Sequence, residues 1–208
     1  RSQVQILSCP PIFIIVRITH NNKHHEGAAF PFNQMPVLSG TSGAEIAEKL
    51  APILGMENLT LESRRFPDGE AYVRIPPESI DAVRSEKVIL VSNTFPDSGI
   101  IQTLLLLGAI RDVRRGDLSS LKGDWIGSAE DVGPGIFLAI PYYGYARQDK
   151  RFNTGESISA RLVAEIISKY CEGIVILDLH SPEVLAEIDV PIEYVSSMPE
   201  IAQKLQKE

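Results

Sequence analysis

Three short and almost wholly apolar runs constrain the fold of this chain more than any other feature of its sequence. They cover residues 87–93 (KVILVSN), 135–140 (GIFLAI) and 173–179 (GIVILDL). Runs of this length are typical of strands that are buried on both faces of a parallel sheet. Helix-like segments separate them, and this alternation predicts an α/β fold with an open parallel sheet flanked by helices.

The helix-like segments are expected at 97–113, at 156–170 and after Met198. Residues 36–54 predict a further unit, in which a short strand is followed by a turn and an amphipathic helix. Within this unit, Ser42 and Glu45 stand three residues apart and match the capping-box pattern of a helix start.

Three segments depart from the alternation. Residues 1–34 mix His, Asn and Pro without periodicity, so we expect them to be disordered or an extension, with Met35 as the start of the folded chain. Residues 114–133 are rich in Gly, Ser and Asp, and we interpret them as a surface insertion. The strand-like residues 59–66 and 70–75 flank the turn sequence Pro-Asp-Gly, which predicts a protruding β-hairpin.

The net charge, the cysteines and the length of the apolar segment at 11–18 argue against several classes of function and location. The net charge of −7 argues against non-specific nucleic-acid binding, because that activity needs a basic surface. Cys9 and Cys171 lie far apart and form no metal-ligand pattern, so we expect a reducing compartment, the cytoplasm. The apolar residues 11–18 are too few to span a membrane, so we expect no membrane association.

Polar and aromatic residues follow each apolar run, at the edge where open parallel sheets bind ligands. After the first run, the segment 92–99 (SNTFPDSG) precedes a helix whose free N–H groups can bind an anion. The alternative is that Asp97 or Ser98 is simply a helix cap.

The second run leads into 141–162 (PYYGYARQDKRFNTGESISARL), where three tyrosines stand beside the cations Arg147, Lys150 and Arg151. Arginine matches phosphate oxygens in bidentate fashion, so this segment is either a phosphate clamp or a solvated loop over core tyrosines. The third run ends in Asp178 and His180, whose side chains we expect to point the same way. Such a pair suits a metal or group-transfer site, or a structural pair in which the carboxylate orients the imidazole.

Three stretches together resemble the amino-terminal half of ribose-phosphate pyrophosphokinase, the phosphoribosyl pyrophosphate synthetase. They are RRFPDGEAYVRI, PYYGYARQDKRFNTGESISARLVA and VILDLHSPEVLAEIDVPIEYVSS. The resemblance covers Pro36 to about Met198 and implies a phosphoribosyltransferase-like fold. It also implies a reaction in which the diphosphoryl group of Mg²⁺-bound ATP passes to ribose 5-phosphate, giving phosphoribosyl pyrophosphate and AMP.

The same resemblance implies that the hairpin reaches ATP bound to a neighbouring subunit, within a homo-oligomer built from dimers, up to a hexamer. Phe66 is expected to stack on the adenine, while Asp68 and Glu70 accept hydrogen bonds from its amine or shape the pocket.

Arg147 and Gln148 are implied to hold the ATP phosphates, and Asp149 to orient the phosphates or the loop. His180 matches the family position that helps to coordinate the catalytic Mg²⁺, and we expect Asp178 to fix its ring. Arg147 and His180 are therefore the predicted catalytic residues.

The sequence departs from the family because it contains no acidic-Thr-Gly-Gly-Thr loop for ribose 5-phosphate and no flexible catalytic loop. Both belong to the family's second domain. We therefore expect residues 35–189 to form the ATP-side domain, residues 190–208 to begin the second domain, and the chain alone to be inactive. The alternative hypothesis is a non-catalytic relative that binds full-length synthetase subunits and regulates them.

Overall fold

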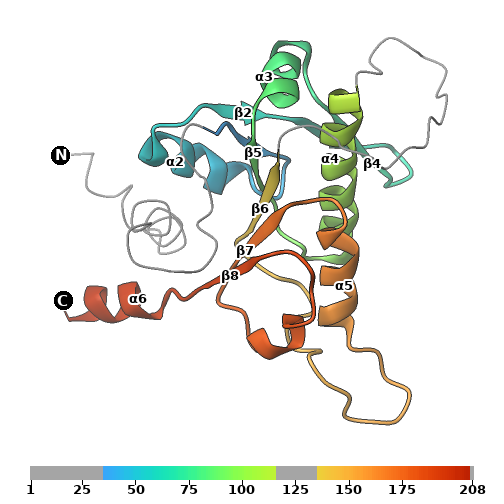
Figure 1. The fold of residues 1–208 in the computed structure, drawn as a ribbon, viewed down its shortest axis with the longest axis vertical. Helices are drawn as coiled ribbons and strands as arrows, with labels where there is room; N and C mark the ends of the chain where they lie inside the picture. The colour runs from blue at the N-terminus through green and yellow to red at the C-terminus, as the bar shows by residue number, and fades with distance from the viewer. Residues whose placement is uncertain (1–34, 116–134, 207–208) are drawn as a thin grey trace.

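The computed structural model describes residues 35–115 and 135–206. Its main sheet has six strands in the order β2-β1-β5-β6-β7-β8, and every pairing in it is parallel (Figure 1). The strands are β1 (Val37–Ser39), β2 (Asn58–Thr60), β5 (Val88–Val91), β6 (Ile136–Ile140), β7 (Gly173–Leu177) and β8 (Ile192–Val195). All residues of β5, β6 and β7 are buried, as the apolar runs predict.

Helices cover both faces of this sheet. On one face lie α3 (Ile80–Ser85), α4 (Asp97–Arg115) and α5 (Ser159–Ser168). On the other face lies α2 (Ala44–Leu54), which packs on β1, β5 and β6. The predicted α/β fold with a parallel sheet flanked by helices is confirmed.

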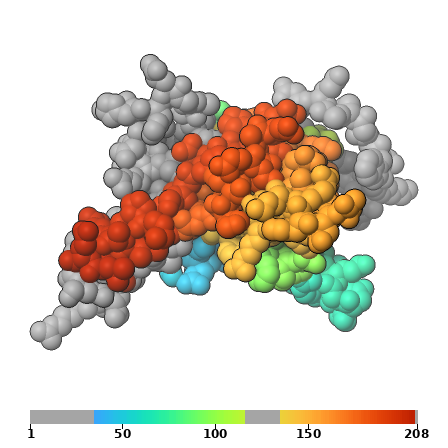
Figure 2. All heavy atoms as spheres, turned by 90° about the horizontal axis from the view of Figure 1, so that it is seen from below, coloured from blue at the N-terminus to red at the C-terminus, as the bar shows by residue number. Residues whose placement is uncertain are grey.

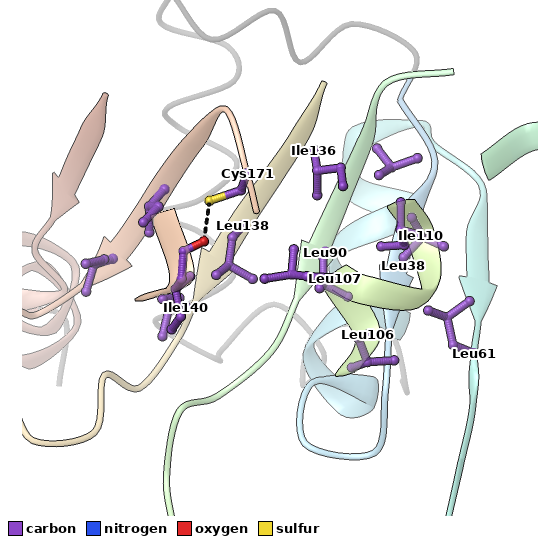
Figure 3. Packing of buried hydrophobic residues seen from close by; sticks show 14 of the residues in the cluster. Leu38, Leu61, Leu90, Leu106, Leu107, Ile110, Ile136, Leu138, Ile140 and Cys171 are labelled. Atoms are coloured by element: carbon purple, nitrogen blue, oxygen red, sulfur yellow. Dashed lines mark hydrogen bonds between the residues drawn. The ribbon is translucent and has the colours of Figure 1, made fainter. Parts of the chain in front are cut away.

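The larger core lies between α4, α5 and the sheet (Figure 3). Leu106, Leu107, Ile110 and Val113 recur at helical spacing along α4 and are buried. They face strand residues such as Leu90 and Leu138 on the sheet surface. This packing fixes where α4 begins, and its start lies at the edge where the strands end.

The predicted hairpin forms from β3 (Glu62–Arg65) and β4 (Ala71–Arg74), which pair antiparallel and protrude beside α4 (Figure 1). Gly69 adopts a φ of 93° in its turn, as the Pro-Asp-Gly sequence predicts. The strand-like residues 59–66 divide, however, because their first part belongs to β2 in the main sheet.

The predicted capping box at α2 is wrong. The helix begins at Ala44, and the residue that precedes it, Gly43, makes no side-chain cap. The Ser42 hydroxyl bonds instead to the Ser92 hydroxyl, and Glu45 pairs with Lys49 one turn later. The tertiary contact between Ser42 and Ser92 therefore replaces the side-chain cap that the local sequence predicts.

Residues 190–208, which we expect to begin a second domain, contain strand β8 and helix α6 (Met198–Leu205). Strand β8 pairs in parallel with β7 and is the sixth strand of the main sheet. After it, α6 extends away from the sheet without burying a residue. The predictions for residues 1–34 and for most of the insertion lie outside the described residues.

No helix among residues 35–115 and 135–206 is long and apolar enough to cross a membrane.

Candidate functional site

A cavity of about 690 Å³ opens at the edge where β5, β6 and β7 end. Arg147 and His180 both line it, together with the aromatic side chains of Phe95, Tyr142 and Tyr145. Its volume is in the range of small-molecule and cofactor sites. Figure 2 views this edge and shows residues 141–158 between the β5–α4 connection and the segment that follows β7.

The loop after β6 is fastened to the loop after β5. The Tyr142 N–H donates to Asn93 Oδ1 at 2.9 Å, and the Thr94 N–H donates to the Tyr142 carbonyl at 3.2 Å. The Gly144 N–H donates to Thr94 Oγ1 at 2.7 Å. A Cβ atom on Gly144 would lie 2.2 Å from the Thr94 carbonyl oxygen, so this close approach requires glycine.

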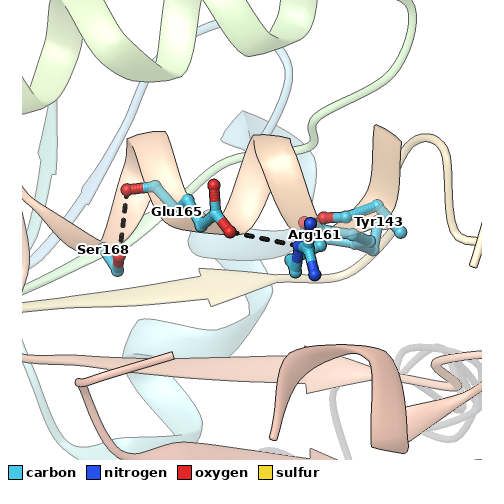
Figure 4. A network of polar contacts seen from close by, with 5 residues as sticks. Tyr143, Arg161, Glu165 and Ser168 are labelled. Atoms are coloured by element: carbon cyan, nitrogen blue, oxygen red, sulfur yellow. Dashed lines mark hydrogen bonds and ion pairs between the residues drawn. The ribbon is translucent and has the colours of Figure 1, made fainter. Parts of the chain in front are cut away.

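Two tyrosines anchor the same loop from opposite sides. The Tyr143 hydroxyl donates to the Ala160 carbonyl of α5 at 2.7 Å (Figure 4), and burial raises the Tyr143 pKa. The Tyr145 hydroxyl donates to Asp97 Oδ1 at 2.7 Å, and this hydrogen bond raises the Tyr145 pKa. The loop thus connects α4 to α5 across the cavity.

Beyond Arg147, a carboxylate organises the loop that leads to α5. Glu156 accepts from the N–H groups of Phe152 and Asn153 at 2.7 and 3.0 Å, and also from the Asn153 side-chain amide. The Asn153 side-chain bond and the two backbone bonds lower the Glu156 pKa. The Lys150 ammonium lies 5.3 Å from the Phe152 ring centroid. The loop is therefore ordered by its own side chains.

The expectation that Asp178 fixes the His180 ring is wrong. Asp178 lies just beyond β7 with a φ of 47°, and its carboxylate accepts from the N–H and the hydroxyl of Ser197. Within the described residues no hydrogen bond joins Asp178 to His180. The left-handed backbone at Asp178 interrupts the strand alternation on which the prediction rested.

The donor set at the cavity does not form a closed metal site. Among the described residues, no group of three or more His, Cys, Asp and Glu side chains is arranged to hold a metal ion. His180 is exposed on the cavity wall. Three residues after His180, the Glu183 pKa is lowered by hydrogen bonds from its own backbone N–H and from Ser181, while burial and the charge of Asp149 oppose this shift.

The other predicted site residues do not line this cavity. Gln148 and Asp149 follow Arg147 but do not line the cavity wall. Phe66, Asp68 and Glu70 lie at the tip of the β3–β4 hairpin.

The hairpin tip is itself ordered. The Arg64 guanidinium lies 4.9 Å from the Phe66 ring centroid and 4.2 Å from that of Tyr72. Asp68 Oδ1 accepts from the Glu70 N–H at 3.1 Å. The tip therefore presents a fixed aromatic ring to solvent, with Phe66 38% exposed.

Sequence reasoning did not find the residues that hold the site together. Asn93 and Thr94 join two loops, and Ser197 engages Asp178. The polar sequence SNT directly after an apolar strand was the available signal for the first two. Ser197 carries no such signal, because its partner lies 19 residues away.

A comparison with known protein families found a family model that matches this chain. The family model for the N-terminal domain of ribose phosphate pyrophosphokinase matches residues 35–116 and 132–170. The two matched parts leave out residues 117–131, which fall within the segment interpreted as an insertion.

Curated relatives agree with this match. A ribose-phosphate pyrophosphokinase of Methanopyrus kandleri is 34% identical over 82% of this chain and 52% of the relative. Ribose-phosphate pyrophosphokinases of Thermoplasma acidophilum and Methanosarcina mazei are 33% and 34% identical over 73% and 76% of the chain. The chain spans about half the length of these relatives.

Among solved structures, phosphoribosylpyrophosphate synthetase from Mycobacterium smegmatis has the same fold, with a TM-score of 0.64 at 23% identity. The similarity covers 84% of this chain and 52% of that one. On the family match over more than half of its residues, the chain belongs to the ribose-phosphate pyrophosphokinase family.

Proposed function

We propose that the described domain is the ATP-binding part of a ribose-phosphate diphosphokinase, which transfers the diphosphoryl group of Mg²⁺-bound ATP to ribose 5-phosphate in the cytoplasm. The products are phosphoribosyl pyrophosphate and AMP. The observation that carries the proposal is the shared position of Arg147 and His180 on one cavity at the carboxyl edge of a parallel sheet. The relatives named above are all enzymes of this name, which favours catalysis over a purely regulatory role.

Arg147 suits the role of a phosphate ligand. Its side chain is exposed on the cavity wall, and within the described residues no hydrogen bond or ion pair engages its guanidinium. An available guanidinium binds phosphate oxygens through two parallel N–H bonds. Transfer of a phosphoryl group depends mainly on such charge stabilisation and alignment. We assign Gln148 and Asp149, the next two residues, to the phosphates and to the orientation of the loop.

The exposed imidazole of His180 fits a magnesium ion that arrives with the nucleotide better than one held in a closed protein site. Mg²⁺ prefers oxygen ligands, keeps several waters, and is usually held by one or two protein groups together with substrate phosphates. When bound, the ion neutralises charge on the phosphate oxygens. His180 would contact the edge of its ligand shell.

We assign the hairpin tip to the adenine of ATP on a neighbouring subunit. Arg64 braces the Phe66 ring, whose exposed area is free to stack on a base. Asp68 and Glu70 supply acceptors beside it for the exocyclic amine. Because none of the three lines the cavity of its own chain, this role needs a second subunit, and we propose a homo-oligomer built from dimers.

The ribose 5-phosphate side of the reaction needs groups beyond this cavity. Holding the attacking hydroxyl in line with the phosphorus contributes roughly 7–11 kcal/mol in oriented reactions. The chain contains no acidic-Thr-Gly-Gly-Thr sequence to bind the sugar phosphate. We therefore expect the 208-residue chain by itself to bind Mg·ATP without forming phosphoribosyl pyrophosphate.

A pair of titrations tests the nucleotide assignment. Mg·ATP and Mg·tripolyphosphate are titrated into the wild-type chain and into Phe66→Ala. We expect Phe66→Ala to weaken ATP alone, since tripolyphosphate has no base. Equal weakening of both ligands, or of neither, contradicts the role of the hairpin. Formation of AMP that depends on ribose 5-phosphate contradicts the expectation of an inactive chain.

Light scattering tests the oligomer. We expect dimers or larger assemblies at micromolar concentration. A monomer throughout this range contradicts the assignment of the hairpin to a neighbouring subunit.

A further inference from the structure

Tyr145 holds an unusual backbone conformation next to the candidate phosphate ligand. Its φ is 63°, in the left-handed region that residues other than glycine rarely adopt. The Gln148 N–H donates to the Tyr145 carbonyl at 2.8 Å and closes a turn that contains Arg147. A conformation of this kind persists only where the surroundings hold it, and such residues cluster at functional sites. The direction in which Arg147 leaves the turn therefore depends on what holds Tyr145.

The side chain of Tyr145 supplies that restraint. Its hydroxyl donates to Asp97 Oδ1 at 2.7 Å, and Asp97 is the first residue of α4. The core packing of α4 makes this a fixed point. Both residues line the same cavity as Arg147. A second restraint lies just before the turn, where Gly144 bonds to Thr94 at 2.7 Å.

The presence of Asp97 at this cavity needs a reason, because a carboxylate repels a phosphate ligand. Asp97 serves there as a hydrogen-bond acceptor for the Tyr145 hydroxyl. Hydrogen bonds to charged groups are shorter and stronger than those between neutral groups.

We propose that Tyr145 and Asp97 are a positioning pair for Arg147. Their hydrogen bond holds the turn 145–148 so that the guanidinium is presented to the phosphates of the nucleotide. The proposal rests on the function proposed above for Arg147, and neither member of the pair contacts the reacting atoms.

Calorimetric titration with Mg·ATP tests this pair through four single variants: Tyr145→Phe, Asp97→Ala, Asp97→Asn and Arg147→Ala. Tyr145→Phe and Asp97→Ala should each weaken binding about three- to tenfold, the worth of one ordinary hydrogen bond. Asp97→Asn keeps an acceptor and should bind at least as tightly as the wild type. If Asp97 acted by charge repulsion alone, Asp97→Ala would also bind more tightly.

The double variant Tyr145→Phe/Arg147→Ala separates positioning from general stability. It should bind no more weakly than Arg147→Ala alone, because the pair is proposed to act through the direction of the Arg147 side chain. Tyr170→Phe, outside the cavity, serves as the matched control and should bind like the wild type. Thermal midpoints check that each variant is folded.

Unchanged affinity in Tyr145→Phe, or full additivity in the double variant, overturns the positioning pair. If Arg147→Ala weakens binding while Tyr145→Phe does not, the proposed function stands and the pair alone is wrong. If Arg147→Ala binds like the wild type, both proposals are wrong.

Discussion

The Asp178 carboxylate accepts hydrogen bonds from both the backbone N–H and the hydroxyl of Ser197. It thereby ties the end of β7, on the cavity wall, to the residue that precedes α6. Ser197 is buried and Asp178 is in a left-handed conformation, so the contact holds a strained position in place.

Ser197→Ala should lower the free energy of unfolding by about 1.5–3 kcal/mol, because it removes a hydrogen bond to a charged group. Urea denaturation measures the change. Ser196→Ala is the control, since the exposed Ser196 hydroxyl only accepts a 3.3 Å contact from Met198. Equal effects in the two variants contradict the importance of the Asp178 contact.

Two glycine substitutions should change stability in opposite directions. Gly144→Ala places a Cβ atom 2.2 Å from the Thr94 carbonyl and should destabilise the fold by about 1–3 kcal/mol through overpacking. Gly108 lies inside α4 with open space around it, so Gly108→Ala should stabilise by about 0.5–1 kcal/mol. Thermal unfolding of both variants checks the pair, and a harmless Gly144→Ala would contradict the close docking of the two loops.

Gln102 joins the base of the hairpin to the rest of the domain. Its amide donates to Thr41 Oγ1 at 2.8 Å and to Ser63 Oγ at 2.6 Å, and accepts from the Ser42 N–H at 3.3 Å. Gln102→Leu keeps the volume but leaves these partners unpaired, so we expect a loss of about 1–3 kcal/mol. The exposed Gln203 gives a control, because Gln203→Leu should stay within about 0.5 kcal/mol of the wild type.

Hydrogen exchange measures the stability of the hairpin itself in these two variants. Gln102→Leu should speed exchange at the β3–β4 amides more than elsewhere. A uniform effect would show that Gln102 stabilises the domain without orienting the hairpin.

The loop 152–156 should respond to acid. The Asn153 side chain and the N–H groups of Phe152 and Asn153 hold the Glu156 pKa below its ordinary value of 4.5. These bonds are therefore fully present above pH 4.5 and are lost as the pH falls through the lowered pKa. Carbon-13 NMR titration of the Glu156 carboxyl should give a midpoint below 4.5. In Glu156→Gln, the Phe152 and Asn153 amide shifts should lose this transition; a midpoint at or above 4.5 contradicts the network.

The strands and the larger helices could be predicted because their signals are local. The apolar runs give β5, β6 and β7 directly, and the helical spacing of leucines gives α4. The failure of the predicted Ser42 cap could not be foreseen, since the Ser42 hydroxyl bonds instead to the Ser92 hydroxyl, 50 residues away. The same applies to Asp178, whose partner and backbone conformation arise from the tertiary structure.

The part of the candidate site that lies within a single segment of the chain could be predicted from the sequence. Arg147 follows a buried strand, and its position on the cavity wall agrees with that pattern. The contacts that set the direction of Arg147, at Tyr145 and Asp97, join residues 48 apart and have no sequence signal of their own.

Calorimetric titration of Mg·ATP into the wild type and Arg147→Ala tests the central claim most directly. Arg147 is expected to contribute a charge-assisted bond of about 1.5–3 kcal/mol, so its loss should weaken binding roughly ten- to hundredfold. Arg161→Ala is the matched control, because that arginine lies on α5 and pairs with Glu165 at 3.2 Å (Figure 4). The account predicts strong weakening in Arg147→Ala and little change in Arg161→Ala; equal affinities of wild type and Arg147→Ala would contradict it.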